Sequence, residues 1–224
     1  MARYSLFLGL LVLISCGQPN QPVPPPAARQ EPPVSQAPAR PLDTRPVIAA
    51  FGDSLTAGYG VETGYSYPDF LQKDLDRAGG RYHVVNEGIS GDTTAGGLAR
   101  VDSVTQLTPK IVILELGGND GLRGLPLAST RGNLDEIVQA LRKSGTRIVL
   151  AGITLPPNYG PDYIHEFEGI YKGLAAKYKL PFIPFLLEGV AGVPGMMQPD
   201  GIHATAKGNE VVATLVMRTL KPLL

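Results

Sequence analysis

The segment VIAAFGDSL, residues 47–55, joins an apolar run to a tight polar turn. Residues 47–51 lack the alternation of a strand that has one face in water, which predicts a buried strand of a parallel sheet. Gly52, Asp53 and Ser54 then form a turn that presents a hydroxyl where the strand ends. Ser54 is therefore a candidate nucleophile, although Gly-Asp-Ser is also ordinary turn chemistry in which Asp or Ser caps the next helix.

Similar apolar runs follow along the chain, and stretches with helical spacing separate them. Leu134, Ile137, Val138 and Leu141 recur at i, i+3, i+4 and i+7, which marks one apolar helix face. Further helices are expected after Pro68, over 164–174 and from about 204 to 220. The other four strands are predicted at 83–86, 111–116, 147–153 and 182–185. The pattern predicts a three-layer α/β/α sandwich with a mostly parallel five-stranded sheet.

In such folds ligands bind at the carboxyl ends of the strands, so the loops there are the places to look for chemistry. The loop at 86–94 and the loop at 117–121 are small, polar and rich in glycine. Glycine lets a substrate oxygen approach a backbone N–H, and an Asn side chain offers an amide donor, which are the parts of an oxyanion hole. The same glycines also suit an ordinary loop.

One histidine has a carboxylate placed three residues before it. Asp200 and His203 lie just before the last predicted helix, at a spacing that allows contact. A serine hydroxyl needs a base to take its proton, and that base needs an acceptor to hold its tautomer. His83 flanks a predicted strand and His165 lies in a helical pattern, so both are expected to serve packing or the surface.

Four segments together resemble the SGNH, or GDSL, hydrolase family: GDSL at 52–55, ISGDT at 89–93, GGND at 117–120 and DGIH at 200–203. The likeness is closest to its bacterial thioesterase I, protease I or lysophospholipase L1 branch, through VVNxxISGDT at 84–93, GLAR at 97–100, ELGGNDGLRG at 115–124, LPPNYG at 155–160 and IPF at 183–185. The resemblance spans roughly residues 48–223 and implies the flavodoxin-like fold of that family.

The resemblance also implies roles for individual residues. Ser54 would be the nucleophile, His203 the general base and then acid, and Asp200 the group that orients it. The oxyanion donors would be the backbone N–H groups of Ser54 and Gly91 and the side-chain amide of Asn119. No metal or cofactor is needed for this acyl transfer. Two further residues, Asp53 and Gly118, match the family motifs in which they lie, but no chemical role follows for them from the sequence.

The acyl group of a substrate needs an apolar groove, and two loops are candidates by position. Leu122 and Leu125 in the first and Tyr159 in the second are expected to line it, unless they only cover the edge of the sheet. The chain departs from many relatives at Ala204, where they carry Pro after the histidine. That departure is expected to loosen the turn slightly without abolishing activity.

The composition excludes several other classes of function. The chain has 224 residues, and its 20 Lys and Arg balance its 20 Asp and Glu, so it has no basic footprint for nucleic acid. One Cys and three scattered His leave too few ligands for a zinc or iron–sulfur site. Neither a phosphate-binding P-loop nor a dinucleotide-binding glycine motif is present.

The amino-terminal residues have the features of an exported lipoprotein. Residues 1–15 contain Arg3 and an apolar run at 6–14, too short to span a membrane, which predicts a signal peptide. The run ends in LISC, which resembles a lipobox with Cys16 as the lipidated residue; an ordinary signal peptide that contains a Cys is the alternative. In resemblance to other lipoproteins, Gly17 rather than Asp after the lipidated Cys implies that the protein is transported on to the outer membrane, if the cell has two membranes.

A proline-rich segment follows Cys16. Ten of the thirty residues from 17 to 46 are proline and large apolar side chains are nearly absent, so 16–46 is predicted to be a disordered, semi-rigid linker of up to ~3.1 Å per residue. It is expected to tether the domain at 47–224 to the cell envelope; a segment that binds a proline-recognising partner is the alternative. The domain is expected to be monomeric.

The leading functional hypothesis is a serine esterase that acts on lysophospholipids, aryl or acyl esters and possibly thioesters through an acyl-enzyme. Membrane anchoring favours lysophospholipids or other exported esters over acyl-CoA thioesters, which are cytosolic. A family member that removes acetyl groups from envelope carbohydrate is one rival. A catalytically silent lipoprotein that only binds acylated or glycan ligands is the other.

Overall fold

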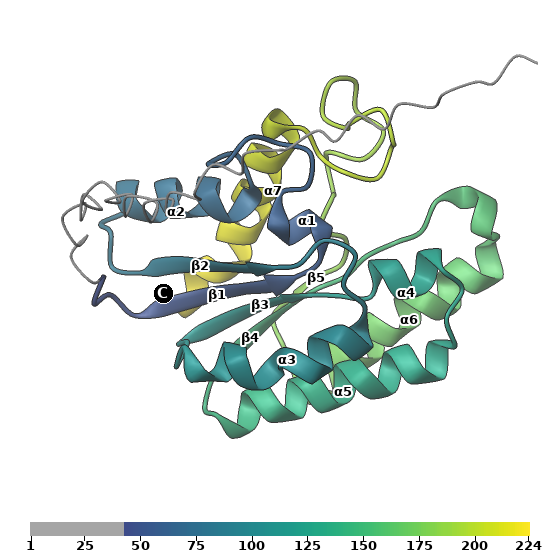
Figure 1. Ribbon diagram of the computed structural model, residues 1–224, viewed down its shortest axis with the longest axis horizontal. Coiled ribbons are helices and arrows are strands. Elements are labelled where there is room, and N and C mark those ends of the chain that lie inside the picture. Colours follow the sequence, from purple (N-terminus) through teal and green to yellow (C-terminus); the bar gives the residue numbers. More distant parts are fainter. Residues whose placement is uncertain (1–42) are drawn as a thin grey trace, which may run out of the picture. The chain divides into compact units, whose positions relative to one another are not determined.

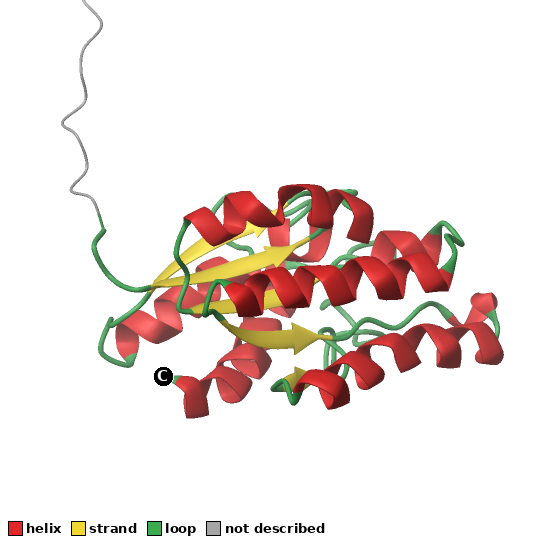
Figure 2. Ribbon diagram, turned by 90° about the horizontal axis from the view of Figure 1, so that it is seen from below, coloured by secondary structure: helices red, strands yellow, loops and turns green. Residues whose placement is uncertain are grey.

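A computed structural model of the protein describes residues 43–224. Its five strands are all parallel and lie in the order β2-β1-β3-β4-β5, with helices on both faces of the sheet (Figures 1 and 2). The strands are β1 (Val47–Gly52), β2 (His83–Gly88), β3 (Ile111–Glu115), β4 (Arg147–Ala151) and β5 (Phe182–Ile183). The predicted three-layer α/β/α architecture is confirmed.

Seven helices occur in the described part of the chain, together with two short 3₁₀ turns, η1 (Pro157–Tyr159) and η2 (Lys221–Leu223). The helices are α1 (Ser54–Ala57), α2 (Tyr67–Arg77), α3 (Thr94–Gln106), α4 (Gly118–Leu122), α5 (Leu127–Lys143), α6 (Pro161–Tyr178) and α7 (Ala206–Leu220). Figure 1 shows α2 and α7 on one face of the sheet and α3, α5 and α6 on the other.

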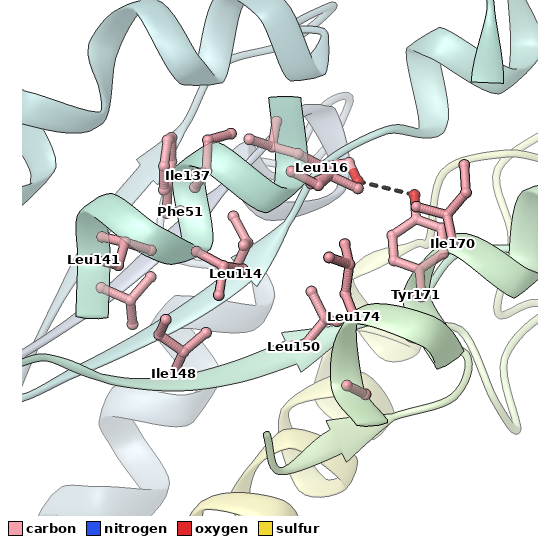
Figure 3. Packing of buried hydrophobic residues seen from close by; sticks show 14 of the residues in the cluster. Phe51, Leu114, Leu116, Ile137, Leu141, Ile148, Leu150, Ile170, Tyr171 and Leu174 are labelled. Atoms are coloured by element: carbon pink, nitrogen blue, oxygen red, sulfur yellow. Dashed lines mark hydrogen bonds between the residues drawn. The ribbon is translucent and has the colours of Figure 1, made fainter. Parts of the chain in front are cut away.

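The core has two halves because successive side chains of a strand point to opposite faces. In β3, Ile111 and Ile113 pack toward α2 and α7, whereas Val112 and Leu114 pack toward α3, α5 and α6. All four are completely buried. Figure 3 shows the half of the core that packs against α3, α5 and α6. There the buried Tyr171 hydroxyl donates to the Leu116 carbonyl oxygen at 2.9 Å. A parallel sheet buried on both faces explains why the strands read as continuous apolar runs.

Some element ends differ from the predicted ones. Strand β4 ends at Ala151 and β5 at Ile183, short of the expected 153 and 185, and in β5 the next residue, Pro184, has no N–H to continue the ladder. The last helix begins at Ala206 because the Thr205 hydroxyl accepts from the Gly208 N–H and caps it. The chain just before this helix forms an isolated antiparallel bridge between Met197 and Ala204.

The helices α3 and α4 are absent from the sequence prediction. Gly96 and Gly97 lower the helix propensity of α3, yet the Thr93 hydroxyl caps it by accepting from the Gly96 N–H. A side chain at 97 would collide with Leu116, so glycine there lets α3 approach the sheet closely. Tertiary packing therefore overrides local propensity at this helix.

The predicted signal peptide, Cys16 and the linker up to residue 42 lie outside the described residues. The last residues of the predicted linker contact the folded part: Arg45 donates to Asp76 at 2.7 Å and to the Gly80 carbonyl at 3.2 Å. Over 43–224, no helix is long and apolar enough to cross a membrane.

Candidate active site

The sheet register brings the sequence motifs together. Gly52 at the end of β1 is paired with Gly88 of β2 on one side and with Glu115 of β3 on the other, so the three following loops leave the sheet at the same edge. The Asp53 carboxylate accepts from the Leu55 N–H at 3.0 Å and caps α1, whose first residue is Ser54. The cap therefore fixes the position of the Ser54 hydroxyl at the carboxyl edge of the sheet.

His203 contacts both of the residues that the sequence pairs with it. Its Nε2 lies 2.8 Å from Ser54 Oγ, and its Nδ1 lies 2.6 Å from Asp200 Oδ2. Because a carboxylate only accepts hydrogen bonds, Nδ1 carries the proton and Nε2 is free to accept the hydroxyl proton of Ser54. This arrangement lets the imidazole take a proton from the serine while the carboxylate stabilises the cation that forms.

Asp200 is held as an anion although its side chain is 38% exposed. Partial burial acts to raise its pKa, but hydrogen bonds from the His203 ring and from the backbone N–H groups of His203 and Ile202 outweigh it and lower the pKa to about 2. Hydrogen bonds to the charged form of a carboxyl group stabilise that form. Asp200 is therefore ionised across the neutral pH range.

The loop that carries His203 is fixed by Gln198, a residue that the sequence analysis did not single out. The Gln198 backbone N–H donates to the His203 carbonyl at 2.8 Å, and its side-chain amide donates to the carbonyls of Ala204 at 2.9 Å and Tyr59 at 2.7 Å. The ring of Tyr59 also packs on the imidazole, with centroids 4.6 Å apart. Gln198 thus connects the loop after Ser54 to the loop that carries His203, through the carbonyls of Tyr59, His203 and Ala204.

Asn119 lies in the first turn of α4, beside the loop that carries Ser54. Its side-chain Nδ2 donates to the Asp92 carbonyl at 2.9 Å and to Asp53 Oδ2 at 3.2 Å. Asn119 and Ser54 both line the same cavity, whereas Gly91 is not part of the lining. Gly91 is joined to Asn119 through Arg123, whose Nη2 donates to the Gly91 carbonyl at 3.1 Å and to Asn119 Oδ1 at 3.2 Å.

A second arginine, Arg100 of α3, connects the ends of β1 and β2 to the loop that precedes α3. Its guanidinium donates to the backbone carbonyls of Gly52 and Glu87, each at 3.0 Å, and pairs with Asp92 at 2.8 Å. It also lies over the ring of Phe51, 4.5 Å from the ring centroid. The sequence contained GLAR at 97–100 as part of the resemblance, but no local signal shows which carbonyls the guanidinium would reach.

A cavity of about 670 Å³ opens beside these polar groups. Asp53, Ser54, Asn119 and His203 form its polar end. The rest of the lining is predominantly apolar and includes Leu55, Leu122, Ile153, Leu155, Pro156, Pro157, Ile164, Phe185, Leu187, Ala191, Met197 and Ile202. Such a shape, with a few polar groups at one end of an apolar cavity, is typical of a small-molecule site.

Of the three residues expected to contact the acyl group, the structure places one in the lining. Leu122 lines the cavity, but Leu125 and Tyr159 do not. Leu125 is 37% exposed and lies three residues beyond Leu122, after the end of α4. Tyr159 supports the wall from outside, since its hydroxyl donates to the Leu122 carbonyl at 2.8 Å. Ile164 and Phe185, which the sequence analysis missed, come from α6 and from the segment after β5.

Among residues 43–224, no group of three or more His, Cys, Asp or Glu side chains is arranged to hold a metal ion. The two other histidines lie apart from the site. His83 opens β2 and its Nδ1 lies 3.2 Å from Asp43, and His165 is exposed on α6.

Comparison with known proteins defines the class. Residues 50–211 match the model of the GDSL-like lipase/acylhydrolase family. The chain is 48% identical over 178 residues to esterase TesA of Pseudomonas aeruginosa, covering 79% of this chain and 89% of that protein. It is 39% identical over 177 residues to thioesterase 1/protease 1/lysophospholipase L1 of Escherichia coli K12, covering 79% and 84%. The chain belongs to the GDSL-like lipase/acylhydrolase family.

Solved structures agree with this assignment. A crystal structure of TesA superposes with a TM-score of 0.77 at 47% identity and covers 80% of this chain and 99% of its own. AlinE4, an SGNH-hydrolase family esterase, gives a TM-score of 0.67 at 44% identity, with coverages of 82% and 98%. Because the curated relatives are an esterase, an arylesterase and a thioesterase/lysophospholipase, the protein is a hydrolase of ester bonds.

Proposed function

We propose that the protein is a serine esterase that cleaves carboxylic esters with medium or long acyl groups through a covalent acyl-enzyme. The observation that carries the proposal is the hydrogen-bonded series Ser54, His203 and Asp200 at the polar end of an apolar cavity of about 670 Å³. A binding protein has no use for a base that accepts from a serine hydroxyl.

The geometry supports a reaction in two steps. Ser54 Oγ attacks the carbonyl carbon of the ester while its proton passes to His203 Nε2. The tetrahedral oxyanion is stabilised by the Asn119 amide and by the backbone N–H groups of Ser54 and Gly91. The C–O bond then breaks, and the leaving alcohol takes the proton from His203. Water repeats the sequence on the acyl-enzyme, with His203 again as the base, and releases the acid.

The cavity and the proposed anchor both support a particular class of substrate. An apolar lining takes a hydrocarbon chain more readily than an acetyl group on a sugar. We therefore propose lysophospholipids and other long-chain or aryl esters as substrates, with thioesters accepted by the same chemistry.

The test of this substrate class is hydrolysis of p-nitrophenyl esters from acetate to palmitate, together with lysophosphatidylcholine. We expect kcat/KM to rise with chain length; a maximum at acetate, with deacetylation of an acetylated glycan, would show a carbohydrate deacetylase instead.

A single substitution in the cavity wall tests which residues contact the acyl group. In Leu122→Trp the indole fills part of the cavity, so we expect kcat/KM for a dodecanoyl ester to fall about tenfold or more while that for the acetyl ester stays within a few-fold. Leu125→Trp is the matched control, since Leu125 lies in the same segment but outside the lining. Equal chain-length profiles for the two variants would contradict an acyl site in this cavity.

We also propose that the mature chain is a monomeric lipoprotein of the cell envelope, anchored through Cys16, on the outer membrane where the cell has two. The proposal is supported by the sequence LISC at 13–16 and by the proline-rich segment after it. We expect the mature protein in the membrane fraction, with an N-terminal peptide that begins at an acylated Cys16. A Cys16→Ala variant is expected to keep its leader or to leave the membrane. A freely soluble wild-type chain without acylation contradicts the anchor.

A further inference from the structure

Glu115 is a buried carboxyl group that the triad does not use. It ends β3, is completely inaccessible to solvent and lies behind the nucleophile loop. Its Oε2 accepts from the Asp53 N–H at 3.1 Å and from the Thr56 hydroxyl at 2.7 Å. Its Oε1 has no hydrogen-bond partner, which is true of no other buried side-chain oxygen or nitrogen in the described residues. An orphaned buried oxygen requires an explanation because unpaired polar atoms are rarely buried.

The site has a second buried carboxyl group in Asp53, which is 2% exposed. Its Oδ1 accepts from the Leu55 N–H, and its Oδ2 accepts from the Asn119 amide at 3.2 Å. The two carboxyl groups are neighbours, because Glu115 Oε2 accepts from the backbone N–H of Asp53 itself. Glycine at 52 makes this approach possible, because a Cβ there would collide with Glu115.

No cation neutralises this pair directly. Over the described residues, neither Asp53 nor Glu115 forms a salt bridge with Lys or Arg. The titratable groups that interact electrostatically with the pair include the His203 imidazole and the buried hydroxyls of Tyr67 and Tyr171. Tyr67 also contacts the Thr56 hydroxyl that donates to Glu115. Two adjacent buried carboxylates repel each other, so a proton is retained between them at neutral pH.

The surroundings decide which of the two keeps the proton. Burial raises the pKa of both groups, and repulsion from Asp53 raises that of Glu115 further. Asp53 has in return hydrogen bonds from Leu55 and Asn119, which favour its charged form. The proton therefore resides on Glu115, and Oε1 becomes a donor.

We propose that Glu115 is a neutral acid that donates from Oε1 to Asp53, and that this pair positions the Asn119 amide at the oxyanion site. The inference rests on the proposed acyl-transfer function, in which Asn119 stabilises the oxyanion. The shared proton weakens Asp53 as an acceptor and lowers the negative charge beside the forming oxyanion. The Asn119 hydrogen on Asp53 is then available to the oxyanion, while the hydrogen bond to the Asp92 carbonyl keeps the amide oriented.

Three variants test this proposal in the full chain. Glu115→Gln keeps a neutral donor and an acceptor, so we expect kcat within about three-fold of wild type. Glu115→Leu keeps neither. In Asp53→Asn the amide oxygen still accepts from the Leu55 N–H, so an NH2 group replaces Oδ2 and the Asn119 amide loses its acceptor. For these two we expect kcat to fall about 10- to 100-fold with KM little changed, below the 10²–10³-fold loss of a complete oxyanion donor. Loss of activity in Glu115→Gln equal to that in Glu115→Leu, or no loss in any variant, overturns the proposal.

Infrared difference spectroscopy gives a readout that does not depend on turnover. At pH 7 we expect the carbonyl stretch of a neutral carboxylic acid in the wild-type chain, lost in Glu115→Gln and kept in Glu166→Gln, which alters an exposed glutamate of α6. Absence of the band contradicts the shared proton, even in a fully active enzyme and even if Glu115→Leu does not fold. A wild-type chain that shows the band but does not react with a fluorophosphonate contradicts the proposed esterase instead.

Discussion

Ser54→Ala is expected to lower kcat for every ester substrate by a factor on the order of 10⁶, as removal of the nucleophile does in other serine hydrolases. The reason is that Ser54 Oγ is the attacking atom and lies 2.8 Å from His203 Nε2, the nitrogen that takes its proton. Without it, no covalent intermediate forms, and only the oxyanion donors and the substrate cavity remain.

Fluorophosphonate labelling followed by intact mass and peptide mapping measures this effect independently of the substrate. We expect one label on the wild-type chain, at Ser54, and none on Ser54→Ala. Ser129→Ala is the control, because Ser129 is exposed on α5 and should leave both labelling and hydrolysis unchanged. A folded wild-type chain that takes no label would show that the four motif segments bind a ligand and do not cleave it.

Asp200→Asn is expected to lower kcat by a factor on the order of 10⁴. An Asn amide can donate to His203 Nδ1, which places the ring proton on Nε2. That nitrogen can then no longer accept the proton of Ser54. The geometry of the loop should survive, because an Asn oxygen can still accept from the backbone N–H groups of Ile202 and His203.

Stopped-flow or steady-state hydrolysis of a p-nitrophenyl ester measures this loss, with Asp162→Asn on the exposed first turn of α6 as a control. Activity above a tenth of wild type would remove Asp200 from the mechanism. The pKa of Asp200, lowered to about 2, adds a pH test. Because the folded pKa is below the unfolded one, Asp200 stabilises the fold above about pH 4 and loses that effect as the pH falls toward 2. An acidic limb of kcat/KM near neutral pH therefore reports another group.

The positions of the strands were predictable because a parallel sheet buried on both faces requires continuous apolar runs, as in β1 and β3. The ends of elements were less so. Strand β5 is only two residues long, and α7 begins at a threonine cap rather than at the first helix-forming residue. Helix α3 was missed because its two glycines lower its helix propensity. The helix is stabilised by packing against the sheet, which the sequence does not show.

The chemical groups of the candidate site were named from the sequence, because each belongs to a short motif whose local geometry is encoded by neighbouring residues. Asp53 caps α1 two residues ahead, and Asp200 accepts from the backbone of the residues that lead to His203. Leu125 and Tyr159 failed as lining residues because position in a loop does not determine which way a side chain points.

The sequence by itself determined where the strands lie along the chain, the turn that presents Ser54 and the short spacing that pairs Asp200 with His203. Only the tertiary structure decided that His203 meets a hydroxyl 149 residues away, and that Glu115 comes to lie against Asp53. The physical reason is range: caps and turns are set by hydrogen bonds within a few residues, whereas side chains distant along the chain meet only where the packed sheet aligns the ends of its strands.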